Sequence, residues 1–123
     1  MKRTDARELA FKTIYCKFFN SEQTDPLEDA DSEGLEFVNK ILSTFANNYD
    51  EINETISKNL KGYTLDRLNK IDLAILYLAV IELNFIKENP KEVIINEAVN
   101  LAKKYSTEKS PKFVNGVLAD IVK

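Results

Sequence analysis

Four residues near the N-terminus, Arg3, Arg7, Phe11 and Tyr15, are spaced four apart and would form one ridge on a helix. Two cations on this ridge lead into two aromatic rings. Guanidinium groups pair with phosphates and aromatic faces stack on unpaired bases, so such a ridge suits single-stranded RNA. The same spacing also fits a helix that buries both rings in the core and leaves the arginines in solvent. Spacing alone leaves both interpretations open.

A second candidate is the stretch KSPKFVNGVL, residues 109–118. Apolar residues at 114, 117 and 121 centre one face of a helix, which places Phe113 on its flank beside Gly116. Glycine costs about 1 kcal/mol relative to alanine inside a helix. Either another helix packs against the bare backbone, or the gap leaves the Phe113 ring open to a base. Lys109 and Lys112 lie near the positive helix end, where free N–H groups can meet phosphate.

Residues typical of catalysis or metal binding are scarce. The sequence has no histidine and one cysteine, Cys16, so triads built on histidine and the usual zinc spacings are excluded. The three glycines are too scattered to cradle a phosphate. Glu82, the one acid in a long apolar run, is expected to be paired structurally rather than catalytic. We therefore expect no enzyme, no metal and no cofactor.

Charge is distributed unevenly along the chain. The net charge is −3, which alone argues against a nucleic-acid partner. Residues 1–17, however, hold five cations against two acids, and residues 103–123 repeat that balance, so both ends are basic. The lone cysteine and the lack of a secretory leader favour the cytoplasm. The longest apolar run, Leu73–Ile81, is far shorter than the roughly 20 residues of a membrane span, so no membrane role is expected.

Apolar periodicity predicts an all-α protein of one domain. The 123 residues are 44% hydrophobic, and three glycines and three prolines leave little room for hairpins. Helices are expected over residues 4–19, 35–46 and 52–60, with an acidic connection after the first. Because the run over 73–86 is apolar on nearly every side, that helix should be central. Two more helices are expected to begin at Pro90 and Pro111, capped by Asn89 and Ser110.

Four segments resemble, in order and spacing, the bacterial NusB family. They are ARELAFKTIY (6–15), LDRLNKIDLAILYLAVIEL (65–83), VIINEAVNLAKKYS (93–106) and KFVNGVL (112–118). The likeness covers most of the chain, while residues 20–62 match only in pattern. It implies two small perpendicular helical bundles packed together, here subdomains of approximately 1–64 and 65–123 within a single domain 1–123.

The resemblance also implies a function. NusB-like proteins bind the boxA segment of nascent RNA with the ribosomal protein NusE, join other Nus factors on RNA polymerase, and suppress premature termination in ribosomal RNA operons. Carried over by position, Lys2, Arg3, Arg7, Tyr15 and Phe113 match the RNA-contacting residues. The sequence departs from the family at Tyr77, where an arginine is common, and at Tyr63, where tryptophan is frequent. Lys109 adds a cation where relatives often have polar or acidic residues.

The candidate RNA-binding set therefore comprises Lys2, Arg3, Arg7, Tyr15, Lys109, Lys112 and Phe113, with no catalytic or metal-binding residue. Two other functions remain open. One is a helical RNA-targeting domain related to that of ribosomal RNA cytosine methyltransferases, and the other is a helical adaptor that binds only protein through exposed apolar patches. The apolar ridge of the first helix could be internal or could serve a homodimer.

Overall fold

The computed structural model describes residues 1–19 and 30–123, and within these ranges the chain is all-α, as the sequence predicts. The α-helices are α1 (Arg3–Phe18), α2 (Ser32–Asn47), α3 (Tyr49–Lys58), α4 (Lys70–Ile81), α5 (Lys91–Tyr105) and α6 (Ser110–Ile121). A 3-10 turn, η1 (Leu65–Arg67), precedes α4, and a π-helical turn, η2 (Glu82–Ile86), continues it.

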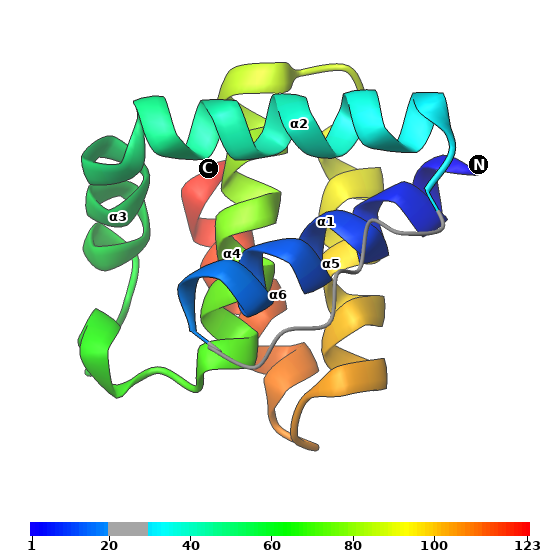
Figure 1. The fold of residues 1–123 in the computed structure, drawn as a ribbon. Coiled ribbons are helices and arrows are strands. Elements are labelled where there is room, and N and C mark those ends of the chain that lie inside the picture. The colour runs from blue at the N-terminus through cyan, green and yellow to red at the C-terminus, as the bar shows by residue number, and fades with distance from the viewer. Residues whose placement is uncertain (20–29) are drawn as a thin grey trace.

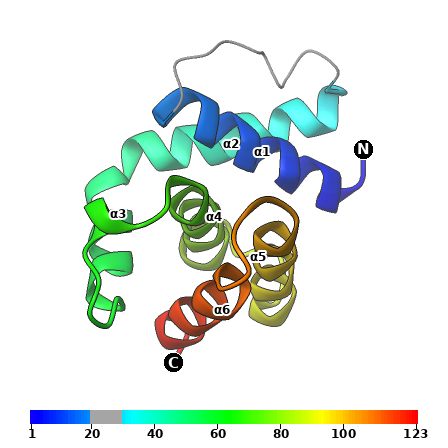
Figure 2. The same cartoon turned by 90° about the horizontal axis from the view of Figure 1, so that it is seen from below.

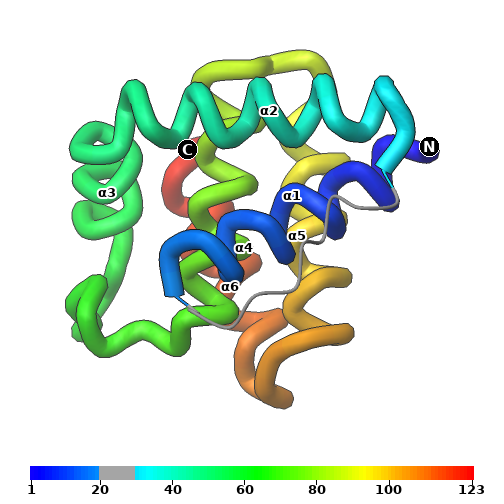
Figure 3. The backbone as a smooth tube through the Cα atoms, viewed as in Figure 1, coloured from blue at the N-terminus to red at the C-terminus, as the bar shows by residue number. Residues whose placement is uncertain are grey.

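The helices form two layers. Figure 2 shows α4, α5 and α6 nearly end-on, while α1 and α2 lie side by side across them. Helix α3 packs against α4 at one edge of the molecule (Figure 1). The tube in Figure 3 shows that η1 and the turn between α5 and α6 lie at the same end of the molecule. That end holds the recess described below.

Helix α4 is the central element, as its apolar sequence predicts. Every residue from Asp72 to Ile81 is buried, and the helix contacts α1, α2, α3, α5 and α6. The buried core runs without a break from α1 through α4 to α6. The division near residue 64 into two subdomains remains a prediction.

Helix ends differ from expectation by a few residues. Helix α1 begins at Arg3 with Lys2 at its N-cap, so Thr4 lies within the first turn and its hydroxyl donates to Glu97 at 2.7 Å. Helices α5 and α6 begin at Lys91 and Ser110, so the caps expected from Asn89 and Ser110 do not form. The expected acidic connection falls largely on residues 20–29, outside the described residues. Among the described helices, none is long and apolar enough to cross a membrane.

Candidate nucleic-acid interface

A recess of about 150 Å³ opens where η1, the start of α4 and the start of α6 meet. Its walls combine two aromatic rings, two cations, a carboxylate and several neutral polar groups. The lining residues are Tyr63, Arg67, Leu68, Asn69, Asp72, Thr107, Lys109, Ser110 and Phe113. Proteins bind unpaired nucleotides by stacking aromatic rings on the bases and by placing cations near the phosphates.

The aromatic wall of the recess is formed by Phe113 and Tyr63. The ring centroids lie 5.4 Å apart at an interplanar angle of 67°, an edge-to-face arrangement. Phe113 is half-buried, while Tyr63 is 55% exposed. Both rings therefore keep accessible surface, as the expectation for Phe113 requires.

Gly116 lies one turn after Phe113 on α6 and is exposed. A Cβ atom added there would meet no atom within 4 Å. Of the two explanations offered by the sequence, packing of another helix against this glycine is therefore wrong. The surface beside the Phe113 ring is open.

The floor of the recess is the buried side chain of Asp72, in the first turn of α4. Its Oδ1 accepts a hydrogen bond from the Ser106 hydroxyl at 2.6 Å, and its Oδ2 accepts one from the Ser110 hydroxyl at 3.0 Å. The Asn69 side chain caps α4 by accepting from the backbone N–H of Ile71 at 2.8 Å. These bonds join the starts of α4 and α6 to the end of α5.

The rim of the recess carries two exposed cations, Arg67 from η1 and Lys109 from the turn before α6. Lys109 belongs to the predicted set. Sequence reasoning missed Arg67, Asp72 and the placement of Tyr63, since η1 lies more than 40 residues before α6. The sequence signal for Tyr63 is that it keeps an aromatic ring at a position where tryptophan is frequent in the family that the sequence resembles.

Lys112 lies on the other side of α6. It lines a shallow groove of about 570 Å³ between α5 and α6 together with Glu92, Ile95, Asn96, Val99, Pro111 and Asn115. Lys109 and Lys112, which both precede Phe113 in sequence, therefore line different concavities.

The structure places Arg7 in the interior rather than on an RNA-binding ridge. Its side chain is 4% exposed and its Nε donates to both Glu82 carboxylate oxygens, at 2.8 and 3.1 Å. Its Nη1 lies 3.7 Å from Glu97, and its Nη2 is buried without a hydrogen-bond partner among the described residues. Because α1 crosses over the end of α4, position 7 faces inward. The guanidinium is not available to phosphate in this structure.

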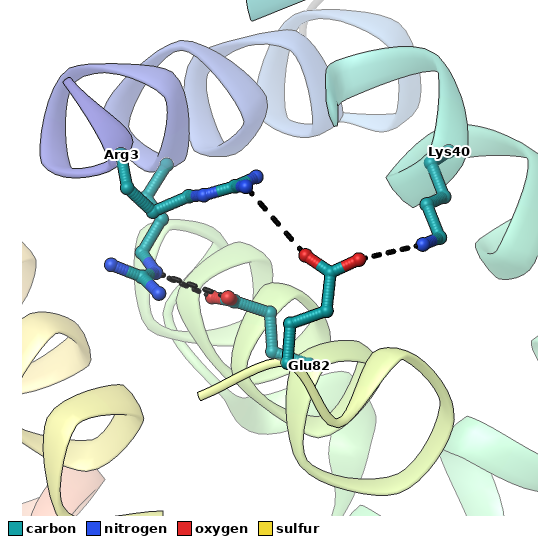
Figure 4. A network of polar contacts seen from close by, with 5 residues as sticks. Arg3, Lys40 and Glu82 are labelled. Atoms are coloured by element: carbon teal, nitrogen blue, oxygen red, sulfur yellow. Dashed lines mark hydrogen bonds and ion pairs between the residues drawn. The ribbon is translucent and has the colours of Figure 1, made fainter. Parts of the chain in front are cut away.

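Glu82 is the lone acid of the apolar run, and it is paired with Arg7, as the sequence analysis expects. Burial raises the pKa of its carboxyl above the ordinary value, while the hydrogen bonds from Arg7 act in the opposite direction. The pair joins α1 to the first residue of η2, close to the Arg3–Glu88–Lys40 contacts (Figure 4). Arg7 and Glu82 thus tie the two layers together.

Arg3 and Lys2, at the start of α1, are exposed. The Arg3 guanidinium lies 4.4 Å from the centre of the Phe37 ring, and its Nη2 is 3.6 Å from Glu88. Lys40 donates to the same carboxylate at 2.8 Å (Figure 4). Arg3 is therefore accessible, although an acid partly offsets its charge.

The aromatic half of the α1 ridge is mostly internal. Phe11 is buried against Tyr105, with ring centroids 5.2 Å apart. Tyr15 is half-buried and packs near Phe19, at 6.3 Å. Helices α4 and α5 lie between α1 and α6 (Figure 2), so the predicted residues do not converge on one groove. Of the predicted residues, the structure brings Lys109 and Phe113 together at the recess.

Comparisons with known proteins place the chain in a defined family. The NusB family model matches residues 4–123. The transcription antitermination protein NusB of Clostridium novyi (strain NT) is 38% identical over 132 residues, covering 100% of this chain and 99% of the relative. The solved structure of T. maritima NusB has a TM-score of 0.88 at 34% identity, covering 98% of this chain and 90% of that one. A structure of antitermination factors NusB and NusE in complex with double-stranded RNA gives 0.85 at 32% identity, covering 97% and 94%.

Proposed function

Because this chain belongs to the NusB family, we propose that it is a transcription antitermination factor that binds boxA-type RNA together with the ribosomal protein NusE. It joins other Nus factors on RNA polymerase in the cytoplasm and suppresses premature termination in ribosomal RNA operons. Its role is to bind rather than to catalyse, so the proposal assigns no catalytic residue and no cofactor.

The observation that carries this proposal is the recess at the start of α6. Phe113 and Tyr63 offer ring surface to an unpaired base, and Arg67 and Lys109 stand at the rim for phosphate. The accessible members of the sequence-derived set, Lys2, Arg3, Tyr15, Lys109, Lys112 and Phe113, remain the proposed RNA contacts. Arg7 is left out because its guanidinium is buried against Glu82.

The comparisons favour antitermination over the two alternative functions. The C. novyi protein, which aligns with this chain over nearly its whole length, is a transcription antitermination protein rather than a methyltransferase. The similar chain in the complex with NusE and RNA argues against an adaptor that binds only protein.

The direct test measures binding of a labelled boxA-type RNA by fluorescence anisotropy, with and without NusE. We expect NusE to tighten binding and a control RNA of scrambled sequence to bind more weakly. The related complex contains double-stranded RNA, so a duplex of the same sequence serves as a competitor. Equal affinity for the boxA-type and scrambled RNAs in the presence of NusE would refute the proposal.

Salt dependence gives a second readout. Five cations are proposed to contact phosphate and would release counterions from a single strand: Lys2, Arg3, Arg67, Lys109 and Lys112. At about 0.7 per phosphate contact, the logarithm of affinity should fall with the logarithm of salt concentration with a slope of about −3.5. A slope near zero would contradict phosphate binding by these residues.

Phe113→Ala tests the ring itself. We expect RNA affinity to fall by about 1–3 kcal/mol, the usual contribution of one stacked base, while the variant stays folded. The matched control is Ile121→Ala, which truncates another half-buried apolar side chain of α6 away from the recess. If both variants lose similar thermal stability and neither loses RNA affinity per folded molecule, Phe113 has a packing role only.

A further inference from the structure

We propose that the recess holds one base of the bound RNA and that this base is guanine, read by the Asp72 carboxylate. The inference rests on the proposed RNA-binding function and adds a base preference to it. Three features of the recess support it: its size, its acceptor at the floor, and its cations at the rim.

The size of the recess limits its ligand to a small planar group. Pockets for drug-sized ligands usually span about 300–1,000 Å³, whereas this one has about 150 Å³. Its aromatic wall places the exposed Tyr63 ring at an edge of the Phe113 ring. A single base can enter against the exposed ring surface, while a folded helix or a peptide side chain with its backbone cannot fill the site as well.

The floor selects for a base edge that donates hydrogen bonds. A carboxylate offers about four lone-pair positions and no proton. Ser106 and Ser110 occupy one position on each Asp72 oxygen, which leaves one on each oxygen for a ligand. The carboxylate is buried and pairs with no cation among the described residues, so these two open positions are available to neutral donors of a ligand. Guanine is the one standard base with two adjacent donors, N1–H and the N2 amino group.

The rim is complementary to the remaining edge of guanine. Arg67 and Lys109 are exposed donors at the opening of the recess, and guanine presents the acceptors O6 and N7, which arginine and lysine commonly bind. On the Watson–Crick edge that would face Asp72, adenine and cytosine each offer one amino group as the donor. Uracil offers one N–H between two carbonyl oxygens, which an anionic floor repels. Guanine therefore satisfies both the floor and the rim.

The test uses the full chain and free mononucleotides, so it depends on neither NusE nor the RNA sequence. Binding of 5′-GMP, 5′-IMP, 5′-AMP, 5′-CMP and 5′-UMP is followed by ¹H–¹⁵N NMR titration. Because the phosphate is common to all five, differences report the base. We expect GMP to bind at least tenfold more tightly than UMP, and IMP, which lacks the N2 amino group, to be weaker than GMP. Equal binding of all five, or no binding of any, would overturn the inference.

Variants locate the effect. Asp72→Asn keeps the size of the side chain but replaces one acceptor with a donor, so the preference for GMP over UMP should fall about tenfold. If this variant fails to fold, the exposed Arg67→Ala and Tyr63→Ala variants still test the site, and each should weaken GMP binding. The control is Lys91→Ala, which removes an exposed cation at the start of α5 that neither lines the recess nor belongs to the proposed RNA contacts. Unchanged GMP selectivity in all three recess variants would overturn the assignment.

Failure of this inference is distinguishable from failure of the proposed function. If the boxA-type RNA binds with NusE while the mononucleotides show no preference, the function stands and the guanine site is refuted. If GMP is selected but the RNA is not bound specifically, the recess is a nucleotide site and the antitermination proposal fails.

Discussion

Replacing Arg7 with methionine tests whether this residue is a structural partner of Glu82 rather than an RNA contact. Arg7→Met leaves a carboxylate that is 3% exposed without the two hydrogen bonds it now accepts, at 2.8 and 3.1 Å. Removing one partner of a buried ion pair costs about 3–5 kcal/mol. With an unfolding entropy of about 2.1 cal/mol/K per residue over 123 residues, or about 0.26 kcal/mol/K, the melting temperature should fall by about 12–19 °C.

The loss should depend on pH in a defined direction. Burial already raises the pKa of Glu82 above its ordinary value of 4.5, and the hydrogen bonds and charge of Arg7 oppose that rise. Without Arg7 the pKa of Glu82 rises further, so the folded state binds more protons than the unfolded state above pH 4.5. Stability therefore decreases as pH rises through this window. Relative to the wild type, Arg7→Met should be more stable at pH 5 than at pH 7.

The assay is thermal and urea unfolding followed by circular dichroism at both pH values. The companion variant is Arg7→Met/Glu82→Leu, which removes both charges and also the buried Arg7 Nη2 that lacks a partner. Apolar replacement of a whole buried pair is often neutral, so this variant should regain most of the stability and bind RNA like the wild type. A loss below about 1 kcal/mol in Arg7→Met, or weak RNA binding by the folded double variant, would refute the structural role.

Three further predictions concern stability. Gly116→Ala should raise unfolding free energy by about 0.5–1 kcal/mol, because the glycine is helical and its surroundings are empty; a loss of stability in urea titration would contradict this. Asn69→Ala should cost about 1 kcal/mol by removing the α4 cap, and unchanged unfolding would show that the cap contributes nothing. Burial raises the pKa of Glu8, but hydrogen bonds from Lys104 and Tyr105 outweigh it and lower that pKa overall. Stability from Glu8 is therefore present above pH 4.5 and is lost as pH falls through the folded pKa. In Glu8→Gln, the melting temperature measured at a series of pH values should therefore fall less below pH 4.5 than it does in the wild type.

The sequence was sufficient to predict the fold class and the central helix. Apolar residues recur with helical spacing in α1, α2 and α5, and α4 is apolar on nearly every side, which requires that other helices surround it. Helix ends were predicted less well because caps depend on tertiary contacts. The Thr4 hydroxyl would satisfy its own helix in isolation, but in the fold it donates to Glu97 on α5.

The candidate site was predicted only in part. Lys109 directly precedes α6 and Phe113 lies one turn later, so their four-residue spacing correctly predicted that they lie near each other. Tyr63, Arg67 and Asp72 come from η1 and α4, and no spacing rule links segments so far apart in the chain. Arg7 illustrates the opposite problem, since a four-residue ridge specifies which side chains share a helix face but not whether that face is inside.

The lone acid at position 82 carried the information that would have resolved Arg7. A buried carboxylate must be neutralised or paired, so an acid within an apolar helix predicts a cation on whichever helix crosses it. Helix α1 supplies Arg7 there, and this pairing holds α1 across the end of α4 near η2. Because the ion pair uses Arg7, Arg3 is the accessible cation of the Arg3–Arg7–Phe11–Tyr15 ridge. The recess, whose cations Arg67 and Lys109 are exposed, is consequently where α6 can bind phosphate and base together.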